Sequence, residues 1–378
     1  MRASKSADAQ ATIFPADKRN GKVCAAVSMS SRAALIILFL TFTLPAWAGA
    51  NFDLVSAAGG ITLSQVGNNY ISSFGTMNAL GIGTPAAGVT VIKLTNGALY
   101  LTTYSLFVHG GLAANDTGFV TAYASTNFGN PVALVLQSCP SSSACTASAQ
   151  FSNLSTNAGA QTTVIARPGI AKSVTVNAGL AIFVPDNNGA NAFQGTDSAV
   201  ITFTMFSNNN GGVIETLQLS LNNPRETLQS AVQLTLGTAT GGLTVSPAAD
   251  YAINFGNVNG LGISPSAGLT VNSATGGVIY ATPYLLQPAF SDQSSTTATI
   301  SVKRTTNFVH PTILIPQDAA AVTGAFTPIV GGGVTITTTA ANRSTITRYL
   351  GLFVSNTNGG AAFTGADTAV LTFQMTVP

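Results

Sequence analysis

The sequence predicts an all-β protein made of two tandem antiparallel β-sandwiches that follow an N-terminal signal peptide. Three observations lead to this prediction. Apolar and polar residues alternate with a period of two in many short runs, Gly- and Asn-rich turns separate those runs, and the chain repeats itself once. We find no ten-residue amphipathic run with helix caps, which argues against an α/β fold. With 46% hydrophobic residues, the 378-residue chain has ample apolar material for a core.

The first element is a short apolar segment that is typical of a secretory signal. Residues 33–44 carry no charge, and Ala46 and Ala48 behind them fit the A-x-A rule of signal peptidase. The segment is too short to span a bilayer as a helix, which needs about 20 apolar residues. We therefore expect residues 1–48 to be a removable signal peptide, with translation starting at Met1 or at Met29. An uncleaved membrane anchor or a buried core helix is the alternative.

The chain is unusually poor in charge. Charged residues make up 7%, against about 25% in an ordinary soluble domain. Removing residues 1–48 leaves eight basic and ten acidic residues, a net charge of −2. Nucleic-acid binding needs clustered Lys and Arg, so it is excluded as a function. We expect a secreted or cell-surface protein, in transit through the periplasm if the source is Gram-negative, that meets a membrane only through the export machinery.

Self-comparison shows two copies of one unit. Tyr100 and Tyr104 recur 180 positions later as Tyr280 and Tyr284, and the strand-like run 198–205 recurs 170 positions later at 368–375. Other landmarks keep the same order, with the segment 70–82 recurring at 251–263. Each copy has the size of a single domain. We place repeat 1 at residues 49–221, a linker at residues 222–226 and repeat 2 at residues 227–378.

Within each repeat the strand pattern is clearest near the end. Ile201, Phe203 and Met205 fall on one face of a strand, while Thr202 and Thr204 fall on the other. Asn and Gly at residues 208–212 supply positive φ for a hairpin loop. The other predicted strands, in order, are residues 89–94, 98–106, 120–124, 132–136, 173–176, 213–221, 297–302, 312–315, 334–339 and 368–377.

Two cysteines remain after the signal peptide, Cys139 and Cys145. They lie where the repeat offset falls from 180 to 170, so they belong to about ten residues that repeat 1 has and repeat 2 lacks. We expect them to form a disulfide that closes a local insertion in an exported protein. A redox-active pair is the alternative, but C-x5-C lacks the C-x-x-C spacing.

Catalytic motifs are missing from the sequence. His109 and His310 fall at non-equivalent positions of the repeats, and we find no nucleophile elbow, zinc motif or phosphate loop. The prediction is therefore a protein that is no enzyme, with no catalytic residue and no cofactor. An enzyme would have to gather scattered carboxylates from Asp53, Asp116, Asp186 and Asp197.

Two repeated polar or aromatic sets are candidates for binding. The first could form calcium loops, although the same residues make turns without metal and their spacing misses the EF-hand frame, so no metal site is predicted. Its members are Asp186, Asn188, Asp197, Asn356, Asn358 and Asp367. The second is Tyr104 with Tyr284, which could contact glycans or pack in the shared core.

The element Phe74-Gly75 to Leu80-Gly81 and the closing strand Asp197 to Phe203, with their second copies, resemble the secreted bacterial β-sandwich modules of the spore coat protein U and pilin-like type. This resemblance implies Ig-like or pilin-like sandwiches and a role as a surface fibre or coat subunit, some of which complete their sandwich with a neighbour's strand. It carries over no catalytic residue.

The function expected from these observations is an exported, non-enzymatic structural or adhesive protein that pairs through strand edges with itself or with other surface proteins. Residues 51–66 or 213–221 are the candidate exchanged strands, and fibres or oligomers of residues 49–378 are expected. A carbohydrate-binding module that recognises glycans is the alternative.

Overall fold

The computed structural model describes residues 52–67, 69–110, 112, 115–141, 143–247, 251–357 and 363–378, without the side chains of residues 222–227. The predicted signal peptide, residues 1–48, and Asn358 lie outside this part. Residues 49–378 form one compact unit. The described chain is all-β, as predicted, and its two short 3-10 turns are η1 (Ser148–Gln150) and η2 (Gly189–Asn191). No helix in the described part is long and apolar enough to cross a membrane.

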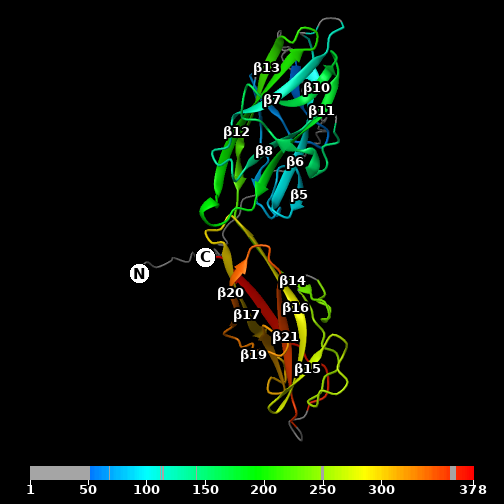
Figure 1. Cartoon of the computed structure of the whole chain (residues 1–378), viewed down its shortest axis with the longest axis vertical. Helices are drawn as coiled ribbons and strands as arrows, with labels where there is room; N and C mark the ends of the chain where they lie inside the picture. The colour runs from blue at the N-terminus through cyan, green and yellow to red at the C-terminus, as the bar shows by residue number, and fades with distance from the viewer. Residues whose placement is uncertain are drawn as a thin grey trace, which may run out of the picture. The chain divides into compact units, whose positions relative to one another are not determined.

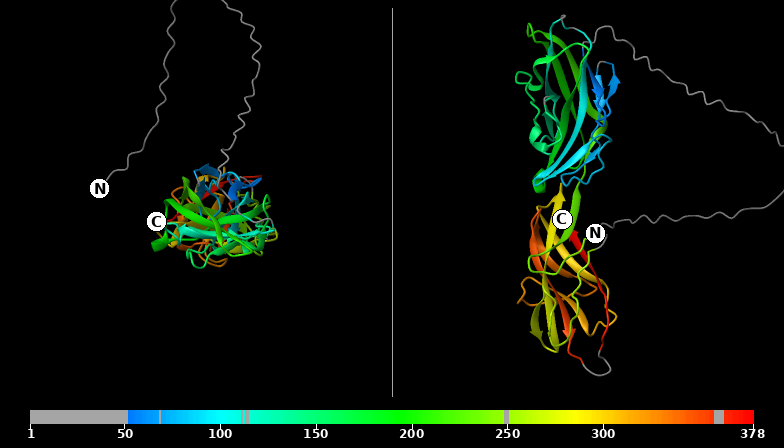
Figure 2. Two further views of the ribbon diagram at one scale, coloured as in Figure 1. Left: turned by 90° about the horizontal axis from the view of Figure 1, so that it is seen from above. Right: turned by 90° about the vertical axis from the view of Figure 1, so that its right-hand side faces the viewer.

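Each repeat is a pair of sheets (Figures 1 and 2). In repeat 1 the first sheet has the order β1-β6-β11-β8-β9, with β5 also paired to β6. Its strands are β1 (Phe52–Ser56), β5 (Thr90–Leu94), β6 (Gly97–Val108), β8 (Val135–Cys139), β9 (Ser152–Asn153) and β11 (Thr175–Pro185).

The second sheet of repeat 1 has the order β10-β7-β12-β13-β3-β2, with β4 also paired to β13. Its strands are β2 (Ser64–Val66), β3 (Asn69–Ser72), β4 (Thr76–Met77), β7 (Gly118–Thr126), β10 (Thr162–Ile170), β12 (Gly195–Ser207) and β13 (Val213–Leu228). The alternation predicted for β12 is confirmed, because Ile201, Phe203 and Met205 are at most 1% exposed. Phe203 packs edge-on against Tyr104 of the first sheet, which joins the two layers of the core.

Repeat 2 repeats the first sheet but has a smaller second one. The first sheet has the order β14-β16-β21-β18-β19, with β15 on β16, and the second has the order β20-β17-β22. The strands are β14 (Ala231–Thr238), β15 (Thr270–Ala274), β16 (Gly277–Ser291), β17 (Thr297–Thr306), β18 (Leu314–Ala319), β19 (Thr327–Pro328), β20 (Val334–Ala341), β21 (Ile346–Ser355) and β22 (Val370–Thr376).

The predicted linker, residues 222–226, lies inside β13 instead of between strands. Leu221 pairs with Ala199 of β12, and Glu226 pairs with Asp197. Residues 222–225 therefore bulge from the ladder, and pairing with β12 then resumes. The Asn- and Pro-rich composition of this segment predicts a break between strands. In the structure it shifts the register of the β12–β13 ladder, but the two strands stay paired on both sides of the shift.

Candidate functional site

The repeated aspartates cap turns. The carboxylate of Asp197 accepts hydrogen bonds from the backbone N–H groups of Gly129 (2.9 Å), Asn130 (2.9 Å) and Ser198 (2.8 Å). Asp367 accepts the corresponding bonds from Val309, His310 and Thr368, and a further one from the His310 ring. Burial acts to raise the pKa of Asp367, but these hydrogen bonds outweigh it and hold the pKa at about 2.

Two of the other calcium candidates are engaged elsewhere. Asp186 forms an ion pair with Arg343, and Asn188 hydrogen-bonds the backbone of Phe290 and Gln293. Asn356 is exposed. Within the residues that the structure describes, no three His, Cys, Asp or Glu side chains are grouped so that they could hold a metal ion. The calcium-loop hypothesis therefore gains no support from the geometry.

The tyrosine hypothesis is wrong for Tyr104 and Tyr284 as glycan contacts. Each side chain is only 1% exposed, so neither ring offers a face to a sugar. Burial raises the pKa of the Tyr104 hydroxyl, and burial together with the adjacent Asp318 carboxylate raises that of Tyr284. Their recurrence in both repeats reflects a shared core position.

The scattered carboxylates that an enzyme would need each have partners of their own. Asp53 accepts a hydrogen bond from Tyr70 (2.8 Å) and pairs with His109, while Asp116 pairs with Ser207. Two surface hollows of repeat 1 are lined by apolar, hydroxyl and amide residues without a titratable side chain. The structure therefore does not bring these aspartates into a common pocket of this kind.

The predicted disulfide between Cys139 and Cys145 is confirmed, with Cα atoms 5.8 Å apart. It lies against Gly179 of β11, where a Cβ would come within 2.8 Å of the Cys145 Cβ. Repeat 2 has Tyr349 at this position and no cysteine. Gly179 thus provides the space that the insertion of repeat 1 occupies.

Repeat 1 closes its second sheet with β13. This strand runs antiparallel to β12 and parallel to β3, so it lies between them. Leu217, Leu219 and Leu221 on its inner face are at most 4% exposed and belong to the same buried core as Phe52 and Tyr70. Without β13, β12 and β3 would each lose a paired strand, and the core that its leucines cover would be exposed.

Repeat 2 has no strand at the place of β13 among its described residues. Its β22 corresponds to β12 and pairs with β17 alone. Leu371, Phe373 and Met375 face inward but are only half-buried, whereas the three matching side chains of β12 are at most 1% exposed. One margin of β22 is therefore unpaired in this part of the chain.

The segment that corresponds to β3 is exposed as well. Tyr70 is 3% exposed in repeat 1, but its counterpart Tyr251 is 41% exposed. The strand β14 is also less covered than its counterpart β1. Leu234 and Leu236 of β14 are half-buried, while the matching Phe52 and Leu54 of β1 are at most 3% exposed. We call β22, β14 and residues 251–255 the open edge of repeat 2.

Sequence reasoning missed the open edge. The alternation of β22 predicts a strand but does not show which of its margins is paired. The two strands proposed for exchange, residues 51–66 and 213–221, are instead paired inside repeat 1: β1 with β6, β2 with β3, and β13 with β12. In this arrangement Phe52 and Leu54 of β1 and the leucines of β13 fill the core of repeat 1, so exchanging either strand would first uncover that core.

No family model and no curated protein matches the chain. Among solved structures, the CupB6 tip adhesin from Pseudomonas aeruginosa is 7% identical with a TM-score of 0.28, covering 87% of this chain and 94% of that one. A tip adhesin in a chaperone complex of CFA/I fimbriae is 11% identical with a TM-score of 0.24, covering 87% and 84%. The secreted serine protease VesC from Vibrio cholerae has 10% identity and a TM-score of 0.16, covering 77% and 51%. With similarity this low, the geometry of the chain itself has to support any function.

Proposed function

We propose that this protein is an exported, non-enzymatic structural or adhesive subunit of a surface assembly, and that its second repeat accepts a β-strand from another subunit. The observation that supports this most directly is the difference between the repeats. The same two-sheet unit is closed by β13 in repeat 1 and has an open edge in repeat 2.

The direction and side-chain pattern expected of the incoming strand can be read from β13. The incoming strand would run antiparallel to β22 and present apolar side chains at alternate positions, as β13 presents Leu217, Leu219 and Leu221 beside β12. Unpaired N–H and C=O groups at a sheet edge provide the hydrogen bonds for such an addition. Each fully buried leucine contributes roughly 1.5–3 kcal/mol, which has to exceed the cost of association.

The donor is proposed to be a different subunit. The described strands of this chain that have a suitable apolar pattern are already paired within repeat 1. Exchanging β13 would open the core of repeat 1 in order to close that of repeat 2. A homopolymer that exchanged β13 would therefore gain little free energy, because one core opens as the other closes. A different subunit with a free extended segment would gain the free energy of the new contact without opening a core of its own.

The test uses a synthetic peptide with the sequence of residues 213–221, carrying a photoreactive group in place of Leu219. The exported chain is mixed with this peptide and irradiated, and cross-links are located by mass spectrometry. We expect cross-links to residues 251–255, 231–238 or 370–377, and a higher melting temperature of repeat 2. A peptide with serine in place of Leu217 and Leu221 is the matched control and should cross-link much less.

Cross-links confined to repeat 1, or equal labelling by both peptides, would contradict the proposal. Fibres of the exported chain by itself would point to self-donation and overturn the choice of a different subunit. Secretion is tested separately by fractionating cells that produce the chain with its signal segment, where retention of an uncut chain in the cytoplasm would argue against export.

A further inference from the structure

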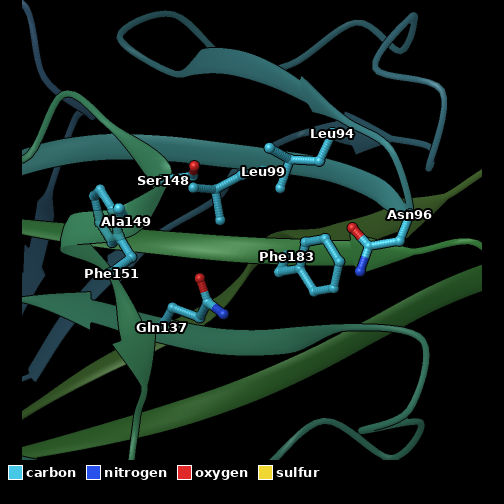
Figure 3. Close-up of a pocket in the computed structure, with 8 residues that line it drawn as sticks. All are labelled: Leu94, Asn96, Leu99, Gln137, Ser148, Ala149, Phe151 and Phe183. Atoms are coloured by element: carbon cyan, nitrogen blue, oxygen red, sulfur yellow. The ribbon is translucent and has the colours of Figure 1, made fainter.

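A hollow in repeat 1 lies on the outer face of the first sheet, away from the core between the two sheets. It has a volume of ≈ 260 Å³, and β5, β6, β8 and β11 supply its floor (Figure 3). η1 and the residue after it, which follow the Cys139–Cys145 loop, supply one wall. Its lining residues include Asn96, Leu99, Gln137, Ser148, Phe151 and Phe183.

The part of the wall formed by η1 belongs to repeat 1 alone, because residues 140–151 join β8 to β9 whereas the shorter segment 320–326 joins β18 to β19. Phe151 has a counterpart: Asn153 pairs with Gln137 as Pro328 pairs with Gln317, so Phe151 corresponds to Phe326. The disulfide joins the base of this insertion to β8, and Cys139, Cys145, Phe151 and Leu99 share one small apolar cluster. Repeat 2 forms the same first sheet without η1 and without a disulfide, so the shared fold does not need these two features.

The polar side chains of the hollow have donors and acceptors that are not used in hydrogen bonds to described residues. The Gln137 amide donates one hydrogen bond to Asn153 (3.0 Å), which leaves its oxygen and one N–H group. The side chains of Asn96 and Ser148 have no hydrogen-bond partner among the described residues. Figure 3 shows the Phe183 ring between the amides of Asn96 and Gln137.

These features fit one class of ligand. The lining carries no charged side chain, which favours a neutral group over an ionic one. Amide and hydroxyl groups both donate and accept, as sugar hydroxyls do, and the electron-rich face of Phe183 attracts C–H groups. The volume lies just below the roughly 300–1,000 Å³ of pockets for drug-sized ligands, so it suits a single ring.

We propose that this hollow binds one neutral sugar residue, as part of a surface glycan. The ring C–H face lies on Phe183, and Asn96 and Gln137 hydrogen-bond the hydroxyl groups. The site uses residues other than Tyr104 and Tyr284, and it does not depend on the open edge of repeat 2.

The test is saturation-transfer NMR on the exported chain, with the methyl glycosides of neutral hexoses and N-acetylhexosamines as probes. We expect transfer to the ring protons of at least one probe. Asn96→Ala and Gln137→Ala should each weaken binding about tenfold, because each removes hydrogen bonds to a hydroxyl group. Gln233→Ala, which removes an exposed amide of repeat 2, is the control and should leave binding unchanged.

A second variant tests the wall. Replacing Cys139 and Cys145 by alanine should abolish transfer while the circular dichroism of the sheets persists, because only the insertion is released. The proposal is overturned if no neutral glycoside receives saturation, if only acidic sugars do, or if Asn96→Ala and Gln137→Ala bind as well as the unmodified chain.

Discussion

The two repeats share a strand pattern but differ in how completely their cores are covered. In repeat 1 the largest inner side chains, such as Phe52 and Phe203, are at most 1% exposed. In repeat 2 their counterparts Leu234 and Phe373 stay half-buried. The difference can be traced to β13, because each of these positions adjoins it or the place where it would lie. One added strand therefore separates a finished sandwich from one that can accept a partner.

The largest expected effect concerns the matched phenylalanines. Phe203→Ala removes a fully buried ring and should lower the free energy of unfolding of repeat 1 by about 3–5 kcal/mol. Phe373→Ala should cost repeat 2 only about 1–2 kcal/mol, since its ring is already half in water. Hydrogen exchange with mass spectrometry in denaturant reports each repeat separately. Equal costs would mean that the edge of repeat 2 is covered in solution.

The next effect concerns a buried ion pair that repeat 2 alone contains. Arg348 pairs with Asp318, and Asp318 also accepts a hydrogen bond from Tyr284 (2.9 Å). The matching positions in repeat 1 are Ala178 and Ser138.

Arg348→Ala leaves the buried carboxylate of Asp318 unpaired and should destabilise repeat 2 by about 3 kcal/mol. The double variant Asp318→Ser with Arg348→Ala installs the residues of repeat 1 and should recover part of this loss. Repeat 1 is the internal reference in the same exchange experiment. A double variant less stable than Arg348→Ala would show that the two side chains act separately.

Much of the fold could be predicted from the sequence because it depends on local pattern. The alternation in β12 and β22 and the turns between strands depend on neighbouring residues. The bridge between Cys139 and Cys145 could be predicted because they are the two cysteines left after the expected signal peptide of an exported chain. The sites depend on what lies across the sheets. Tyr104 is an aromatic residue of the kind that contacts glycans, but it is buried in the core. Phe183 lies at an outward position of β11, and the segment around η1, far from it in the sequence, makes this position part of a hollow.

The smallest expected effect separates the two turn-capping aspartates. Asp367 has a pKa of about 2 in the folded protein, below its ordinary value of 3.8. A lowered pKa stabilises the fold above about pH 4, and this contribution is lost as the pH falls toward 2. The His310 ring supplies one of the hydrogen bonds responsible. In repeat 1 the matching residue is Asn130, whose side-chain amide lies 3.5 Å from the Asp197 carboxylate.

His310→Asn should therefore raise the pKa of Asp367 and move the acid unfolding midpoint of repeat 2 upward, by less than about one pH unit. The backbone N–H groups of Val309 and residue 310 still bond the carboxylate, so the shift stays small. The loss of stability should be fully present above about pH 4 and should disappear as the pH falls toward 2, and repeat 1 should unfold at its former pH. An acid titration followed by hydrogen exchange measures both repeats at once. A midpoint of repeat 2 that does not move would mean that the backbone N–H groups alone lower the pKa of Asp367.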